Sequence, residues 1–162
     1  MQLHGSCHCG AVRFQLRSSQ PVPYLRCYCM VCRKTAGAGG FAINLGGEFD
    51  SLDVTGCEHV SIYRARLTDA ATGEAVESSA QRHFCNRCGS ALWVWDPRWP
   101  ELVHPHASAI DTELPVPPDY VHIMLGSKAN WAEVQTTPGD ACFDRYPDES
   151  LADWHARRGL PG

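Results

Sequence analysis

The sequence predicts a mainly β protein with small helices and a short helix near its C-terminus. Short apolar runs recur along its 162 residues, separated by Gly, Pro and Asp, and several of them alternate apolar with polar side chains. Few segments carry the spacing and capping signals of a helix. In addition, most of the nine cysteines lie in short motifs, which favours bound metal over a disulfide framework.

Five segments are predicted to be strands. In residues 11–17, Val12, Phe14 and Leu16 alternate with polar side chains, as in a half-buried strand. The other predicted strands are residues 41–45, 60–65, 91–95 and 120–125. Turns are expected in "GGEFD" (46–50) and "ATGEA" (71–75), and the proline-rich stretches 98–108 and 113–120 are interpreted as surface connections.

The strongest helix signal is "PDESLADWHARRG" (147–159). Asp148 is a plausible N-cap, Leu151 and Trp154 share a face, and Gly159 suits the position after the helix. A second short helix is expected to begin within "MVCRKTAG" (30–37) and to end at the glycines that follow. Because no linker is evident, we expect one zinc-binding domain over residues 1–162, with a core at about 5–135 and a C-terminal extension at 136–162.

Charge and hydropathy exclude several classes of partner. The formal net charge is −4 and the pI is about 6.0, and no basic stripe is present, so nucleic acid is not expected as a partner. No apolar run approaches the roughly 20 residues of a membrane-spanning helix, and the N-terminus lacks the pattern of a secretory signal. We therefore expect a cytoplasmic protein without a membrane partner, in which the thiols stay reduced.

Two cysteine pairs are spaced to hold one closed metal site. Cys85 and Cys88 form a C-x-x-C motif followed by glycine, and Cys7 and Cys9 form a C-x-C motif flanked by glycines. Two intervening residues allow both sulfurs to face one ion at about 2.3 Å. Four thiolates complete a tetrahedral structural zinc site, which would tie the first strand to the strand beginning near residue 91. The alternative is that one pair consists only of buried thiols.

A second set contains Cys27, Cys29 and Cys32 in "RCYCMVCRK" (26–34). Three protein ligands with one open position are typical of catalytic zinc. The spacing equally allows a second closed site, completed by Cys57 or His59, with Cys142 a weaker candidate for the fourth ligand. The residues alone leave these two alternatives open.

Three motifs in this order resemble a known family. They are "GSCHCGAVRF" (5–14), "CYCMVCRKTAGA" (27–38) and "HFCNRCGSALW" (83–93). Together they resemble the glutathione-dependent formaldehyde-activating enzyme family, which includes the centromere protein V type domain. The resemblance extends from about Gly5 to Trp131 and takes in "SAIDTELP" (108–115) and "HIMLGSKANW" (122–131).

The resemblance implies a fold, cofactors and a reaction. The implied fold is the Mss4-like zinc-binding β fold. The implied cofactors are two zinc ions, one structural and one at the reactive centre. An open centre of three thiolates should hold its metal less firmly than a closed one, so the second site can be partly occupied or empty in purified protein. The implied structural ligands are Cys7, Cys9, Cys85 and Cys88, and the implied catalytic centre is Cys27, Cys29 and Cys32. The family's named reaction joins glutathione to formaldehyde, giving S-hydroxymethylglutathione, and is classed as a carbon–sulfur lyase reaction.

The sequence departs from the family pattern at a few positions. Tyr28 stands where a histidine is expected, residues 68–77 form a longer connection, and Cys57 matches no motif. Beside the second motif, three cationic side chains are candidates for substrate binding: Arg26, Arg33 and Lys34. We do not expect a third metal site at His104 and His106.

Two functions follow from the residues and the resemblance. The first is an enzyme, a carbon–sulfur lyase of the S-(hydroxymethyl)glutathione synthase type, whose partners are a small-molecule thiol and an aldehyde. Zinc stabilises the thiolate, which is the nucleophilic form of a thiol and can attack an aldehyde carbonyl. The alternative is a binding or interaction module in which both ions only hold the fold. An open coordination position facing a pocket would distinguish the first from the second.

Overall fold

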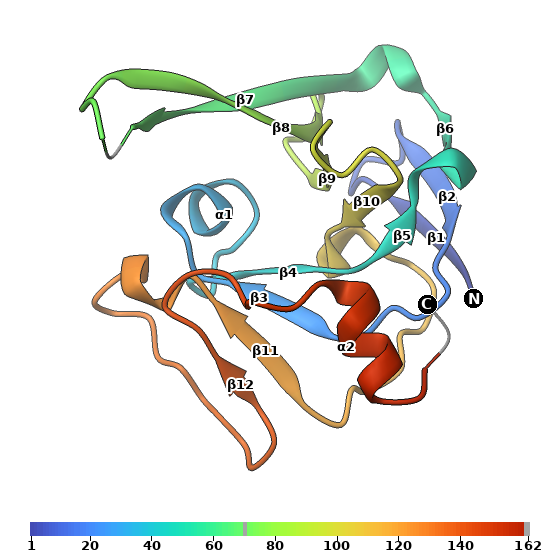
Figure 1. Ribbon diagram of the computed structural model, residues 1–162. Helices are drawn as coiled ribbons and strands as arrows, with labels where there is room; N and C mark the ends of the chain where they lie inside the picture. The colour runs from blue at the N-terminus through green and yellow to red at the C-terminus, as the bar shows by residue number, and fades with distance from the viewer. Residues whose placement is uncertain (70, 161–162) are drawn as a thin grey trace.

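The computed structural model describes residues 1–69 and 71–160 and confirms the mainly β prediction. Within these residues the chain forms three sheets and two short α-helices, joined by 3-10 turns (Figure 1). The turns are η1 (Phe49–Ser51), η2 (Cys57–His59), η3 (Ala107–Ala109) and η4 (Leu125–Ser127). All five segments that were predicted to be strands contain one.

The first sheet has three strands in the order β1–β2–β6. They are β1 (Gln2–Ser6), β2 (Arg13–Arg17) and β6 (Asp53–Thr55), and both pairings are antiparallel. Leu3 lies opposite Leu16 in the register, and both side chains are fully buried. The alternation that predicted β2 therefore reflects one face packed on the core and one face in water.

The second sheet has five strands in the order β5–β10–β9–β8–β7. They are β5 (Gly47–Glu48), β10 (Leu102–Pro105), β9 (Ala91–Trp95), β8 (Ala75–Cys85) and β7 (Val60–Thr68). The interpretation of residues 98–108 as a surface connection is wrong, because β10 lies between β5 and β9 and Val103 is fully buried. Four residues between prolines are too few to show a period, which explains the error.

A long hairpin extends from this sheet. β8 pairs with β9 only through residues 81–84, whereas its pairing with β7 continues out to Ala75, so the hairpin reaches beyond the rest of the sheet (Figure 1). The turn expected at 71–75 joins the two strands: the Asp69 carboxylate accepts the backbone N–H of Ala71 and of Thr72. The other expected turn, 46–50, instead contains β5 and the start of η1.

The third sheet has four strands in the order β12–β11–β3–β4. They are β12 (Ala141–Cys142), β11 (Tyr120–Ile123), β3 (Tyr24–Cys27) and β4 (Ala42–Asn44). β11 is parallel to both of its neighbours, β3 and β12. β3 ends at Cys27, and the first helix begins three residues later, at Met30.

Both predicted helices are present. They are α1 (Met30–Thr35) and α2 (Leu151–Arg157). The N-cap of α2 is Ser150 rather than the expected Asp148, because Ser150 and Asp153 form a reciprocal capping box. Trp154 and His155 of α2 are buried, and Gly159 takes the left-handed conformation expected after the helix.

The largest buried cluster lies between the first and second sheets. It includes Leu3, Leu16, Trp93 and Val103, together with two cysteines of the first and third motifs, Cys7 and Cys85. The C-x-C and C-x-x-C motifs thus begin at the edge of the main core. No helix within the described residues has the length and apolar character needed to cross a bilayer.

Candidate functional site

The first cysteine cluster joins the end of β1 to the turn between β8 and β9. The Sγ atoms of Cys7, Cys9, Cys85 and Cys88 all lie within 4.8 Å of one another. Cys7 and Cys85 are buried, whereas Cys9 and Cys88 are exposed. The sequence paired these motifs from their spacing alone, and the fold brings them together.

Local backbone geometry explains how each motif turns. The N–H of Gly10 donates to the carbonyl of Cys7 at 2.9 Å, and the N–H of Gly89 donates to the carbonyl of Cys85 at 2.8 Å. Both glycines have a positive φ, +73° and +76°, which other residues rarely adopt. The Ser90 hydroxyl connects the motifs, since it accepts the N–H of His8 and lies 3.2 Å from the Cys88 sulfur.

The spacing of the sulfurs fits a tetrahedral ion. Bonds of about 2.3 Å to a central zinc place tetrahedral sulfurs about 3.8 Å apart. The Sγ–Sγ distance is 3.5 Å for Cys7 and Cys9 and 3.8 Å for Cys9 and Cys85. A disulfide requires about 2.05 Å. The cluster therefore has the dimensions of a four-thiolate metal site.

Hydrogen bonds favour the thiolate form of two cysteines in this cluster, Cys88 and Cys7, whereas the pKa of Cys9 is raised to about 11: a backbone hydrogen bond with Ala11 lowers it, but the side chain of Cys7 and burial outweigh this. The pKa of the Cys88 thiol is lowered to about 5, first by the side chain of Ser90 and then by the backbone N–H groups of Ser90 and Cys9. Burial raises the pKa of Cys7, but hydrogen bonds outweigh burial and leave that pKa below its usual value. The N–H of Val12 donates to the Cys7 sulfur at 3.2 Å, and the side chains of Cys9 and Cys85 add to the effect. Thiolates are the form that binds metal.

The second cluster lies where β3 passes into α1. The Sγ atoms of Cys27, Cys29 and Cys32 also lie within 4.8 Å of one another, and Cys27 and Cys32 are buried. Cys29 is the N-cap of α1, and its sulfur accepts the N–H of Cys32 at 3.3 Å. The helix start thus turns three nearby cysteines toward one point.

This cluster favours one thiolate before any metal binds. The pKa of Cys29 lies well below its usual value because the thiols of Cys27 and Cys32 donate to its sulfur, and the backbone N–H groups of Cys32 and Val31 add to the effect. The pKa of Cys27 is raised by its hydrogen bonds with Cys29 and Cys32 and by burial. The pKa of Cys32 is raised to about 11. The hydrogen bond with Cys27 and the charge of Arg82 lower this pKa, but the hydrogen bond with Cys29 and burial raise it by more.

The candidates for a fourth ligand lie elsewhere. Within the described part of the chain, the second cluster contains three cysteines and no further histidine, cysteine or carboxylate. The Cys57 sulfur donates to the carbonyl of Val54 at 3.3 Å, and His59 lies 3.6 Å from the Glu58 carboxylate. Cys142 is exposed on β12. The absence of a fourth protein ligand in a metal-loaded protein stays a prediction.

A buried chain of polar groups begins beside the second cluster in the sequence. Tyr28, between Cys27 and Cys29, is fully buried, and its hydroxyl lies 3.1 Å from Nδ1 of His122. Nε2 of His122 lies 3.2 Å from the Asp140 carboxylate, which also accepts the N–H of Tyr120. Sequence reasoning noticed Tyr28 only as a departure from the family pattern and had no signal for its partners.

The three predicted cationic side chains lie in different environments. The Arg26 guanidinium lies over the ring of Tyr120, 3.5 Å from its centroid, and 5.2 Å from that of Phe41. Arg33 has a buried Nε without a hydrogen-bond partner, and Lys34 is exposed. Sequence reasoning missed a fourth cation, Arg82, because β8 carries no alternation that would assign its face.

Two comparisons with known proteins name the same family, and a third finds a similar solved structure. The family profile described as "Glutathione-dependent formaldehyde-activating enzyme" matches residues 2–127. A protein of Halomonas elongata named "Putative glutathione-dependent formaldehyde-activating enzyme" is 59% identical over 160 residues, which cover 99% of this chain and 98% of that protein. A crystal structure of a Rhodobacter sphaeroides protein is similar with a TM-score of 0.52 and 26% identity, covering 71% of this chain and 92% of that chain.

Proposed function

Because the chain belongs to the glutathione-dependent formaldehyde-activating enzyme family, we propose that it is a zinc-dependent carbon–sulfur lyase of the S-(hydroxymethyl)glutathione synthase type. Its substrates are glutathione or a similar thiol, and formaldehyde or another small aldehyde. The observation that carries the proposal is the division of seven cysteines into one group of four and one group of three. A group of four thiolates fills a tetrahedral ion, whereas a group of three leaves one position for a substrate.

The two groups have different roles in this proposal. Cys7, Cys9, Cys85 and Cys88 hold a structural ion between the first and second sheets. Cys27, Cys29 and Cys32 form the catalytic centre. Zinc held by the second group supplies positive charge that favours the thiolate form of an incoming thiol. Since three thiolates already exceed the charge of a divalent cation, this centre suits thiol activation better than water activation.

The reaction then balances without a further reagent. The substrate thiol loses its proton, its sulfur attacks the carbonyl carbon of the aldehyde, and a carbon–sulfur bond forms while the carbonyl oxygen takes up a proton. The reverse reaction breaks the same bond. The chain contributes two things: thiolates held at the start of α1, and the positive charge of Arg82, which attracts an anionic substrate.

The remaining proposals concern organisation. One domain spans residues 1–162, and the extension at 136–162 belongs to it, because β12 pairs with β11 and α2 packs on the residues before β3. We place the protein in a reducing compartment, the cytoplasm, because oxidised cysteines would not bind metal.

The test is catalysis of thiol–aldehyde exchange. Zinc-loaded protein is mixed with glutathione and formaldehyde, and the exchange between free and hydroxymethylated glutathione is measured by NMR exchange spectroscopy against the uncatalysed rate. We expect acceleration by the wild type and by Cys57→Ala, and none by Cys29→Ser. A wild-type rate equal to the uncatalysed rate would favour the binding module instead.

A further inference from the structure

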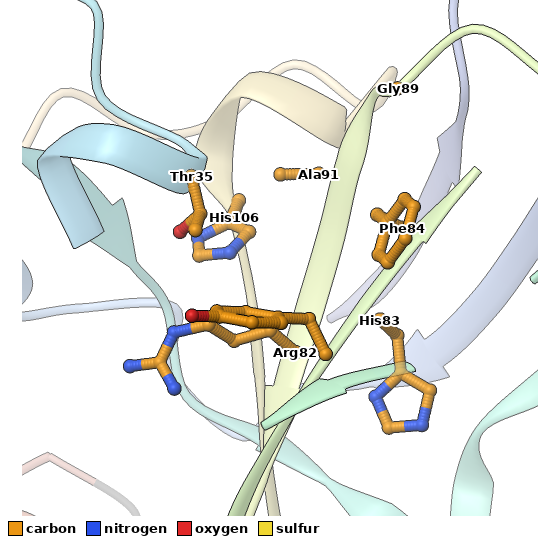
Figure 2. A pocket seen from close by; sticks show the side chains of 8 residues that line it. Thr35, Arg82, His83, Phe84, Gly89, Ala91 and His106 are labelled. Atoms are coloured by element: carbon orange, nitrogen blue, oxygen red, sulfur yellow. The ribbon is translucent and has the colours of Figure 1, made fainter. Parts of the chain in front are cut away.

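A cavity of about 400 Å³ lies between β8 and the end of α1. Its lining residues are Thr35, Tyr63, Arg82, His83, Phe84, Gly89, Ala91 and His106. None of them is acidic, so the cavity carries the positive charge of Arg82. Figure 2 shows the side chains of Thr35, Arg82 and His106 on one side of the cavity, with the ring of His83 turned away from them.

Arg82 is an arginine whose charge the described residues leave unpaired. Its Nε and Nη1 atoms are buried and have no hydrogen-bond partner, and no ion pair of Arg82 is found within residues 1–69 and 71–160. By contrast, Arg98 lies 2.7 Å from the Asp96 carboxylate and Arg158 lies 2.6 Å from that of Asp119. Buried guanidinium nitrogens without partners are unfavourable unless a ligand supplies acceptors.

His106 adds a second unpartnered group to the same cavity. The residue is only 3% exposed, and its Nδ1 is buried without a partner. Its pKa is lowered to about 4, by burial first and then by the charges of Arg82 and His104, so the ring is neutral at pH 7. A neutral imidazole that carries its proton on Nδ1 can donate one hydrogen bond to an oxygen.

The cavity adjoins the three-cysteine cluster. Thr35 follows Cys32 by one turn on α1, so the two side chains lie on the same face of the helix. Thr35 and Arg82 line the same cavity. A small molecule with its sulfur at the cluster would therefore extend past Thr35 into the cavity that Arg82 lines.

We propose that this cavity is a carboxylate subsite that selects thiols bearing a carboxylate, with Arg82 as the main contact and His106 and Tyr63 beside it. A guanidinium donates two parallel hydrogen bonds to a carboxylate, which gives both affinity and orientation. The proposal rests on the proposed function, because it assumes that a thiol binds at Cys27, Cys29 and Cys32.

The test compares two thiols that differ in one group. Binding of 3-mercaptopropionate and of 3-mercaptopropan-1-ol to zinc-loaded protein is measured by isothermal titration calorimetry. We expect the wild type to bind the acid on the order of tenfold to a hundredfold more tightly than the alcohol. Arg82→Gln should lose this preference and still bind the alcohol, while Arg82→Lys should keep part of it. Arg64→Gln, which removes an exposed charge from the neighbouring strand, should behave as the wild type.

The outcomes separate the two proposals. If the wild type binds neither thiol, the proposed function and the subsite both fail. If the wild type binds both thiols equally, or if Arg82→Gln retains the preference with an unchanged zinc content, the subsite is wrong and thiol binding stands. Should Arg82→Gln not fold, the wild-type preference and its reduction in Arg82→Lys still decide the question.

Discussion

At the residue scale, the sulfurs of Cys29 and Cys57 have different hydrogen-bond partners. Cys29 begins α1, where backbone N–H groups point at its sulfur, and two further thiols donate to it. Cys57 donates its own proton to a backbone carbonyl on the first sheet. The donors around its sulfur therefore prepare Cys29 to bind a cation.

We therefore predict different metal contents for two variants. Cys29→Ser should remain folded and keep the proposed structural ion but lose most of the second, whereas Cys57→Ala should keep both. Zinc per chain, measured by mass spectrometry after dialysis, checks this expectation together with a circular dichroism spectrum. Loss of one zinc equivalent in Cys57→Ala would mean that Cys57 completes the second site.

Asp96 leads to a prediction about pH. Its side chain is fully buried, accepts from Ser79 and pairs with Arg98. Burial alone would raise the pKa of the Asp96 carboxyl, but the hydrogen bonds of Arg98 and Ser79 outweigh burial and lower it. A carboxylate with a lowered pKa stabilises the fold above its unfolded-state pKa, and this contribution is lost as the pH falls through the folded-state value.

Asp96→Asn should accordingly cost about 1–3 kcal/mol at pH 7. The difference from the wild type should shrink as the pH falls below about 4, where the Asp96 carboxyl begins to be protonated in the unfolded chain, and should vanish below the lowered pKa of the folded state. Urea unfolding across this pH range checks it, with Asp148→Asn, at an exposed position, as the control. A difference that does not vary with pH would rule out the carboxylate as its source.

At the scale of elements, the C-terminal helix is attached by a few specific contacts. Trp154 is buried, Arg158 lies over its ring at 4.4 Å, and Nε2 of His155 lies 2.6 Å from the carbonyl of Val22. The capping box of Ser150 starts the helix. Packing should therefore contribute more to this helix than capping does.

Two variants compare the contributions of packing and capping to the stability of α2. Trp154→Ala should lower the free energy of unfolding by about 3 kcal/mol, because it leaves a cavity under α2. Ser150→Ala should cost only about 1 kcal/mol, since it removes a single cap. Chemical denaturation of both variants measures the difference. Equal costs would show that α2 is held by its own helical propensity instead of by docking.

The same scale shows what the sequence could and could not predict. Strands with one buried face, such as β2, are predictable from the alternation of apolar and polar residues. α2 is predictable from the spacing of its apolar residues and from the glycine that follows it. β8 was not predicted, because its residues 75–79 are largely polar and pair only within the exposed hairpin. β10 was not predicted, because its four residues form a strand only by pairing with β5 and β9, and β5 is distant in sequence.

At the scale of the whole molecule, the four-cysteine cluster joins the ends of two sheets that meet over the main core. Cys7 and Cys85 are members of that core, so an ion there would fix the first sheet against the second. Metal binding at such a place contributes directly to the free energy of folding. The second cluster lies at the start of a six-residue helix and links no sheets in this way.

Cys85→Ser should therefore unfold the protein or reduce it to a loosely packed state, while variants of the second cluster stay folded. Thermal melts with and without a strong zinc chelator measure this. Chelator should lower the wild-type melting temperature to that of Cys85→Ser. A zinc-free Cys85→Ser protein with native stability would contradict the structural role.

Some residues of the candidate site were predictable from local sequence, and others depend on the fold of the whole chain. Cysteine spacing was sufficient to group seven residues into two sets, because C-x-C and C-x-x-C motifs chelate through their own backbone. Arg82, His106 and His122 were not predictable, because each is placed by backbone pairing with a segment that is distant in sequence. A single sequence carries no record of such pairings.

The separation of the paired cysteines also has a consequence for how the protein is made. Cys29 and Cys32 are three residues apart, whereas Cys9 and Cys85 are separated by 76. Closing the longer loop costs about 3 kcal/mol more in chain entropy. On a ribosome that adds roughly 5–20 residues per second, Cys32 emerges seconds before Cys85. The nascent chain can thus load its first ion at the three-cysteine cluster, while Cys7 and Cys9 wait for their partners. The centre expected to hold zinc least firmly in the finished protein is then the first to receive it.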